Sequence, residues 1–326
     1  MKYSESELLK FYEQLVRGRK YEEKIITLLG QGKLQGFFHL GIGQEASQVG
    51  VVNALGPNDY LVPTHRFHPG LVNKLDLKKL TAELLGRRSG YNKGHAFTFH
   101  ISSKAERILP VNGMLGAGIP NAVGYAWALK MDKKDSVVVC VLGDGAAAEG
   151  NVHEGMNIAA NLNVPIVFYI ENNGWAVSNP FNEQTKIKNL SERASAYGMT
   201  GITVDGNDVI KVKETLEDAI AKARKGQPSI VEAKVSRWRG HFEGDPGFYR
   251  NPEELETAYK EDCIKRMKNT LLEQGISEKK FEEIDEKVHQ EIEEAFNYAE
   301  KEPFPTAEEI LNYDNVYATN LGGDLL

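Results

Sequence analysis

The chain has 326 residues, of which 41% are hydrophobic, and this is enough to bury a sizeable core. Its 39 basic and 46 acidic residues give a formal net charge of -7 with no basic tract, which argues against a nucleic-acid partner. The charged N-terminus has no apolar region of a secretory signal, and no apolar stretch approaches the roughly 18 residues that span a bilayer, so we expect a cytoplasmic protein that does not bind membranes.

The N-terminal third of the chain predicts helices separated by loops rich in Gly, His and Pro. A helix is expected over residues 4–32, where apolar side chains recur on one face. Shorter helices are expected near residues 44–55 and 76–86. Residues 89–118 carry glycines and histidines with little periodicity, and a loop of this length in a compact domain is usually functional or disordered.

From residue 120 onward, helical patterns alternate with short apolar runs. Strands are expected at residues 137–142, 164–170, 201–204 and 229–235. Helices are expected at residues 120–131, 149–162, 190–197 and 209–225. Such alternation implies right-handed crossovers and a parallel sheet, and the unbroken apolar character of the first two strands predicts that helices cover both of its faces. The fold class is therefore α/β, with a doubly wound parallel sheet.

The C-terminal region is rich in Glu and Lys. Residues 252–301 predict two charged helices, and we interpret their charge as a solvated face. The chain contains neither an internal repeat nor a low-complexity linker. We expect one domain over residues 1–326, with a helical N-terminal segment (1–35) and a helical C-terminal extension (252–326).

Two of the predicted strands end in polar groups that bind cations. The first apolar run ends at Gly143-Asp144-Gly145, and the second ends at Asn172-Asn173. Ligands of open α/β sheets bind outside the carboxyl ends of the strands, so Asp144 and Asn173 should emerge at the same edge. Few hard oxygen ligands suit Mg²⁺, which usually completes its coordination with phosphate oxygens and water. The pattern predicts an anchor for Mg²⁺ and a diphosphate.

The glycines on either side of Asp144 should let the backbone turn tightly and approach a ligand closely. The N-terminus of the following helix should face the same edge and favour anionic groups. The alternative is structural, with a helix-capping aspartate and a turn-forming pair of asparagines. A lone Gly-Asp-Gly would favour that alternative, whereas the matched end of the second strand favours the anchor.

The two strand ends together resemble the thiamin diphosphate-binding motif, and the rest of the chain narrows the resemblance. Six motifs occur in the order found in the alpha chain of the decarboxylating component of 2-oxo acid dehydrogenase complexes. They are FFHLGIGQEA, THRFH, NGMLGAG, GDGAAAEG, ENNGWAVS and RGHFEGDPGFYR. The resemblance covers residues 5–315 and implies the thiamin diphosphate-binding fold. HFEGD is most similar to the acetoin dehydrogenase alpha chain, and ENNGWAVS is nearer the branched-chain type.

The resemblance implies a metal site and a diphosphate site. Mg²⁺ would be bound by Asp144, Asn173 and the backbone carbonyl of Trp175, a position where the family usually has Tyr. Arg66 matches the arginine that contacts the diphosphate, and His65 replaces its usual Tyr partner. His241 matches a histidine that reaches the diphosphate.

The resemblance also assigns the thiamin end of the cofactor and two catalytic histidines. Backbone groups of Gly113 and Leu115 would bond the aminopyrimidine, and Leu115 would be the wedge that bends thiamin. Ordinary core packing is the alternative for Leu115. Among the histidines, family position favours His39 and His241 as catalytic residues.

The family's activating glutamate lies on a beta chain, and no residue here is identified with it. Glu45 and Glu149 are candidates for structural roles only. The chain also holds one thiamin-type domain where the reaction needs two. The resemblance therefore implies half of an active site, completed by a beta subunit in an α₂β₂ heterotetramer that works with the lipoyl domain of a dihydrolipoyl acyltransferase.

The implied activity is that of an oxidoreductase. It would cleave a pyruvate-type 2-oxo acid or acetoin with thiamin diphosphate and Mg²⁺, and pass the acyl group to the lipoyl group. A branched-chain 2-oxo acid dehydrogenase alpha subunit is the alternative within the family. A nucleotide-dependent Mg²⁺ enzyme would need glycine patterns that this sequence lacks. The intact Asp144 and Asn173 argue against a non-catalytic Mg-diphosphate-binding subunit.

Overall fold

The computed structural model describes residues 3–97, 100–111 and 113–312. Asn112 of the NGMLGAG stretch and the end of the expected C-terminal extension (313–326) lie outside the described residues. Five parallel strands form one sheet in the order β1-β2-β3-β7-β6. The strands are β1 (Tyr60–Val62), β2 (Val138–Gly143), β3 (Ile166–Asn172), β6 (Thr200–Asp205) and β7 (Ser229–Lys234).

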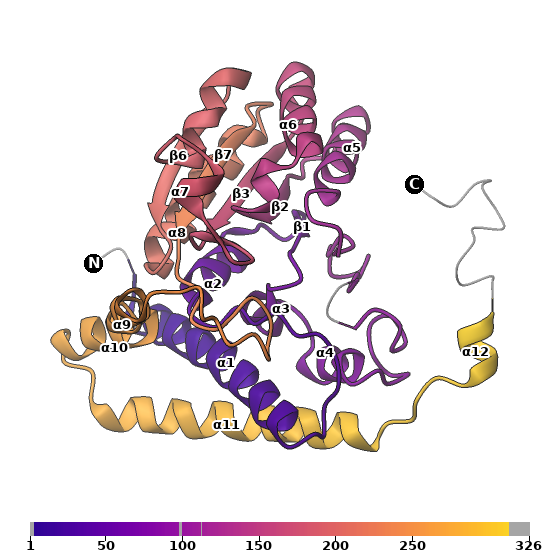
Figure 1. Cartoon of the computed structure of the whole chain (residues 1–326), viewed down its shortest axis with the longest axis vertical. Coiled ribbons are helices and arrows are strands. Elements are labelled where there is room, and N and C mark those ends of the chain that lie inside the picture. The colour runs from indigo at the N-terminus through magenta and orange to yellow at the C-terminus, as the bar shows by residue number, and fades with distance from the viewer. Residues whose placement is uncertain (1–2, 98–99, 112, 313–326) are drawn as a thin grey trace.

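Successive residues of the central strands enter two different apolar cores. Val138, Cys140 and Leu142 of β2 pack with α5 (Gly118–Met131) and α6 (Gly150–Leu162). The intervening valines of the same run pack on the other side, where α2 (Glu45–Ala54) and α8 (Val209–Ala223) cover the sheet (Figure 1). Burial on both faces explains the unbroken apolar run and confirms the predicted α/β class.

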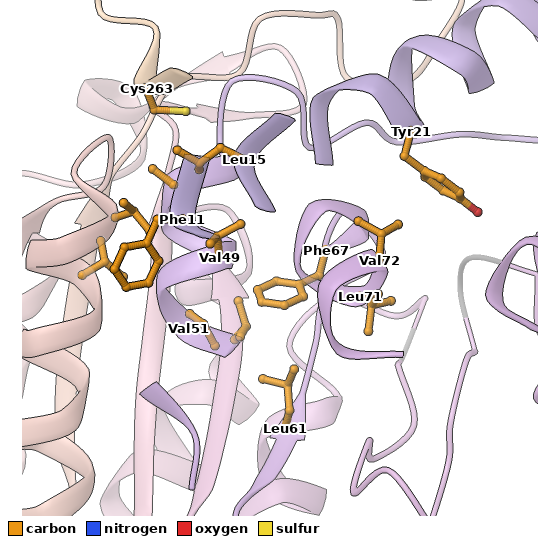
Figure 2. Close-up of a cluster of buried hydrophobic side chains, with 14 of the residues drawn as sticks. Phe11, Leu15, Tyr21, Val49, Val51, Leu61, Phe67, Leu71, Val72 and Cys263 are labelled. Atoms are coloured by element: carbon orange, nitrogen blue, oxygen red, sulfur yellow. The ribbon is translucent and has the colours of Figure 1, made fainter. Parts of the chain in front are cut away.

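A second layer of helices packs behind α2. It consists of α1 (Glu5–Gly30), α3 (His68–Lys74) and α4 (Leu77–Leu84). Figure 2 shows Phe11 and Leu15 of α1 near Val49 of α2, in the same cluster as Leu71 of α3 and Phe67, which precedes α3. The helix α1 begins at a capping box, in which Ser4 and Glu7 bond each other's backbone N–H groups. It thus has a fixed start and a buried inner face.

The structure differs from the predicted elements in the N-terminal half and at residues 190–197. The strand β1 and the helix α3 lie in a stretch that predicted loops around one short helix. Residues 190–197 form a 3₁₀ helix instead of an α-helix. After Gly145, a 3₁₀ turn (Ala146–Ala148) precedes α6. Short elements follow β3, namely β4 (Trp175–Ala176), β5 (Asn179–Pro180) and α7 (Phe181–Gln184).

The charged side chains of the C-terminal helices form a solvated face, as predicted, but the expected number of two helices is wrong and the opposite face is buried. Three helices occupy residues 252–301: α9 (Pro252–Lys260), α10 (Cys263–Glu273) and α11 (Glu278–Lys301), and α12 (Ala307–Leu311) follows them. Phe281, Val288, Ile292 and Phe296 of α11 are buried where this helix packs on α1 and α4 (Figure 1). These apolar residues recur at helical spacing, and the many Glu and Lys residues between them face water.

None of the helices in the described ranges is both long and apolar enough to cross a bilayer. Outside α11 and α1, the longer helices are the crossovers that flank the sheet. Because β2, β3 and β7 are parallel neighbours, their carboxyl ends lie at one edge of the sheet.

Phe281→Ala should lower the free energy of unfolding by about 3–5 kcal/mol, because it leaves a cavity between α11 and α1. The ring of Phe281 is 1% exposed and meets the ring of Tyr12 edge-on, with 4.9 Å between the ring centroids. Urea denaturation would measure the loss. Phe248→Ala is the control, since Phe248 is 91% exposed. Equal small losses in both variants would contradict a core contribution from α11.

Candidate active site

A cavity of about 300 Å³ lies at the carboxyl ends of the central strands. Asp144 follows β2, Asn173 follows β3 and Arg237 follows β7, and all three line this cavity. Because β2 and β3 are paired neighbours, with Gly143 opposite Glu171, the two strand ends meet at one edge. This confirms that Asp144 and Asn173 emerge at the same edge of the sheet.

The carboxyl group of Asp144 is buried and only partly satisfied by hydrogen bonds. Burial raises the pKa of its carboxyl group, and backbone N–H groups, including that of Asn173, oppose the rise. Within the described part of the chain, its buried Oδ2 has no hydrogen-bond partner. An orphaned buried oxygen is costly, and a bound cation removes the cost.

The oxygen atoms around Asp144 suit a hard cation that also binds ligands from outside the protein, such as phosphate oxygens and water. Asn173 Oδ1 accepts a hydrogen bond from the backbone N–H of Trp175 at 3.2 Å, so the turn after β3 curls around this amide. Among the described residues, no three His, Cys, Asp or Glu side chains gather as a metal cage. One carboxylate with amide and carbonyl oxygens is the kind of partial site that Mg²⁺ shares with phosphate.

The two glycines beside Asp144 differ in what they contribute. A Cβ at Gly145 would lie 2.7 Å from the Cβ of Ala176, whereas a Cβ at Gly143 would meet open space. Gly145 has an ordinary φ of -62°, and neither glycine has a positive φ. The chain does turn at Asp144-Gly145 and continues into the 3₁₀ turn Ala146–Ala148, but this turn needs no positive φ. Close packing against Ala176 requires a glycine at Gly145 only.

Three histidines expected at the site come together. The ring of His39 lies 4.6 Å from that of His65 and 4.8 Å from that of His241, both edge-on. His65 and His241 line the cavity, and His39 lies behind them. Burial, with Arg66 nearby, lowers the pKa of His39 to about 3 and that of His241 to about 4. The cluster is therefore uncharged at neutral pH.

Arg66 is buried at the wall of the cavity. Its Nη1 donates to the carbonyl of Leu40 at 2.6 Å, and its Nη2 donates to the carbonyl of His241 at 2.9 Å. Burial, with Arg237 nearby, lowers the pKa of Arg66 to about 10, so the guanidinium stays charged at neutral pH. Two backbone carbonyls thus fix a cation beside the cavity, and each Nη keeps a second N–H for a ligand.

Of the two residues expected to bind the aminopyrimidine, one lines the cavity and the other does not. Leu115 lines the cavity and is 44% exposed, so the alternative of ordinary core packing is wrong. Gly113 is exposed and does not border the cavity. Trp175 borders it and sends its indole N–H away to Glu254, at 2.9 Å.

Two buried charged residues at the site escaped the sequence analysis. Glu171 precedes the asparagine pair and accepts a hydrogen bond from Ser47 Oγ at 2.6 Å, and burial raises its pKa to about 7. Arg237 is 1% exposed and donates to the carbonyl of Val177 and to the Tyr249 hydroxyl. Each lies at or just beyond the carboxyl end of a strand, so the reasoning applied to Asp144 could have found them.

Asp245 holds the loop that carries His241. Its carboxylate accepts hydrogen bonds from the backbone N–H groups of His241 and Gly247 and from the hydroxyl of Tyr249, at 2.6, 2.9 and 2.6 Å. The same hydroxyl accepts from Arg237 at 2.8 Å. The backbone of His241 is therefore fixed before any ligand binds.

Comparison with known proteins identifies relatives along nearly the whole chain. Residues 13–308 match the family model of the dehydrogenase E1 component. The chain is 38% identical over 311 residues to the alpha subunit of acetoin:2,6-dichlorophenolindophenol oxidoreductase of Bacillus subtilis (strain 168), which covers 94% of this chain and 93% of the relative. It is 36% identical over 314 residues to the pyruvate dehydrogenase E1 component subunit alpha of Zymomonas mobilis, and the match covers 95% of this chain and 88% of the relative.

His39→Gln should reduce the loss of stability on acidification. An unfolded histidine binds a proton near pH 6.5, whereas folded His39 resists protonation down to about pH 3. The unfolded state therefore binds more protons as the pH falls from 7 to 5, and the folded state loses stability. Urea midpoints at pH 7 and pH 5 would measure the difference. An unchanged difference in the variant would show that His39 titrates normally in the folded chain.

Proposed function

The chain belongs to the dehydrogenase E1 component family, and from that premise we propose that it is the alpha subunit of a pyruvate-type 2-oxo acid or acetoin dehydrogenase that uses thiamin diphosphate. The observation that carries the proposal is the edge of the sheet where Asp144, with its orphaned oxygen, meets Asn173. Thiamin diphosphate, when bound, supplies the carbanion chemistry that cleaves the bond beside the substrate carbonyl.

In this proposal, Mg²⁺ is bound by the side chains of Asp144 and Asn173 and by the carbonyl of Trp175. The charged guanidinium of Arg66 on the cavity wall supports the anionic diphosphate, whose oxygens would share the metal with these residues. Arg66 binds the diphosphate, with His65 and His241 as neutral hydrogen-bonding neighbours. Gly143 and Gly145 bring the backbone to the same ligand.

The thiamin end of the cofactor lies toward Leu115, which presents an apolar side chain at the cavity. His39 and His241 serve the substrate as catalytic residues. Their lowered pKa values keep both rings neutral, so each ring can offer the substrate one N–H donor and one nitrogen acceptor.

A beta subunit completes the site in an α₂β₂ heterotetramer. An apolar surface on α5 and α6 supports a partner, because several large side chains there face water. They are Tyr125, Trp127, Met131, Ile158 and Leu162. Monomeric proteins rarely expose apolar side chains in such a group. The acyl group then passes to the lipoyl domain of a dihydrolipoyl acyltransferase, in the cytoplasm. A branched-chain 2-oxo acid remains the alternative substrate.

The full chain should show no turnover of pyruvate or acetoin with thiamin diphosphate and Mg²⁺, and should gain it on mixing with the beta chain of the same complex. The described residues place no carboxylate that we can assign to the aminopyrimidine ring, and half of the site is missing. An assay that couples turnover to reduction of 2,6-dichlorophenolindophenol would measure both cases. Robust turnover by the single chain would refute the two-subunit proposal.

Asp144→Ala should abolish binding of Mg²⁺ and thiamin diphosphate without lowering the melting temperature. The substitution removes a proposed metal ligand and also an unsatisfied buried oxygen. Titration calorimetry would measure the affinity. Asp132→Ala is the control, because Asp132 is the C-cap residue of α5 and the cavity lies at the other end of this helix. Unchanged affinity in Asp144→Ala would exclude the metal site.

Leu115→Ala should lower turnover of the reconstituted enzyme far more than it lowers cofactor affinity. A wedge acts on the shape of the bound cofactor, and the diphosphate can still hold a flattened one. Because Leu115 is 44% exposed, the loss of stability should stay within about 0.5 kcal/mol. Turnover and the melting temperature, measured on the same preparation, would show whether Leu115 acts on the cofactor or on stability. Normal turnover would exclude the wedge.

A further inference from the structure

A buried carboxyl group on α1 reaches the two loops that carry Arg66 and the histidine cluster. Glu22 is completely buried in the middle of this helix. Its Oε1 accepts a hydrogen bond from the backbone N–H of Gly41 at 2.7 Å. The same oxygen lies 3.0 Å from Nδ1 of His68, two residues after Arg66. One carboxyl oxygen therefore joins the segment around His39 to the start of α3.

The peptide unit between Leu40 and Gly41 links Glu22 to Arg66. The N–H of this unit is the group that Glu22 accepts, and its C=O is the group to which Arg66 Nη1 donates at 2.6 Å. The N–H and the C=O of one planar peptide point in opposite directions. Fixing the N–H therefore fixes the direction of the carbonyl that holds the guanidinium. Hydrogen bonds in such a chain also polarise and strengthen one another.

The two loops pack closely around this peptide. A Cβ at Gly41 would lie 2.4 Å from the backbone oxygen of Arg66, so the two loops touch through their backbones. Gln48 donates to the same oxygen of Arg66 at 3.2 Å and accepts from the N–H of Gly70. The carboxyl group of Glu22 is the acceptor that turns this contact into a defined position.

We propose that Glu22 is a positioning residue that orients the guanidinium of Arg66 toward the anionic ligand, acting through the Leu40–Gly41 peptide. The inference rests on the proposed function, in which Arg66 binds the diphosphate. It assigns no contact between Glu22 and the ligand. Its effect must therefore disappear when the arginine is removed.

The test is a double-mutant cycle with Glu22→Leu and Arg66→Met on the full chain. Leu fills much of the same space without an acceptor, and Glu22→Met replaces it if Glu22→Leu does not fold. Glu22→Gln keeps an oxygen for the N–H of Gly41, and Glu23→Gln is the matched control at an exposed neighbour. Calorimetry would give the affinities for thiamin diphosphate and for inorganic pyrophosphate, each with Mg²⁺, and melting would report the fold.

Glu22→Leu should weaken both ligands at least tenfold, whereas Glu22→Gln and Glu23→Gln should stay within threefold of the wild type. In the Arg66→Met background, Glu22→Leu should have no further effect on either ligand. Wild-type affinity in Glu22→Leu, or an equal loss with and without the arginine, would overturn the inference and leave the proposed function standing. A wild-type chain that binds neither ligand would overturn the proposed function and the inference with it.

Discussion

The parallel pairing of β2 with β3 is the constraint on which the site depends. Its register places Gly143 opposite Glu171, so the chain leaves both strands at the same height. Asp144 follows at once on one strand, and Asn173 follows two residues later on the other. The adjacent pairing of β7 with β3 brings Arg237 to the same edge. The apolar side chains that bury the sheet on both faces thus determine where the polar groups meet.

Burial gives these polar groups their chemical character. The histidines are held neutral, and the pKa of Asp144 and that of Glu171 are raised, while Arg66 stays charged. The lining of the cavity therefore combines a positive charge and neutral hydrogen-bonding groups with carboxyl and amide oxygens. In the proposed function, these groups complement a metal diphosphate, which carries both a cation and anionic oxygens.

Much of this arrangement could be predicted from the sequence, because unbroken apolar runs and the polar residues that end them are clear sequence patterns. The apolar runs that form β2 and β3 and the small polar groups at their ends gave the parallel sheet, its cover on both faces and the meeting of Asp144 with Asn173. The strand β1 was missed because three residues form a strand only against the edge of β2. The position of Glu171 at the end of β3 could have been recognised in the same way as that of Asp144, whereas its hydrogen bond with Ser47 could not, because only the fold brings the two together. The buried face of α11 was hidden by its many charges.

The water-facing apolar surface on α5 and α6 has a consequence for the supply of the chain in the cell. A chain that waits for a partner keeps Tyr125, Trp127 and Met131 in contact with water. Such a surface is prone to non-specific association and attracts chaperones and proteases. In the proposed heterotetramer, surplus chain is therefore a burden, and the amounts of the two subunits must be matched. Genes that are transcribed and translated together would meet that requirement, because each new chain would then find its partner before it finds a copy of itself.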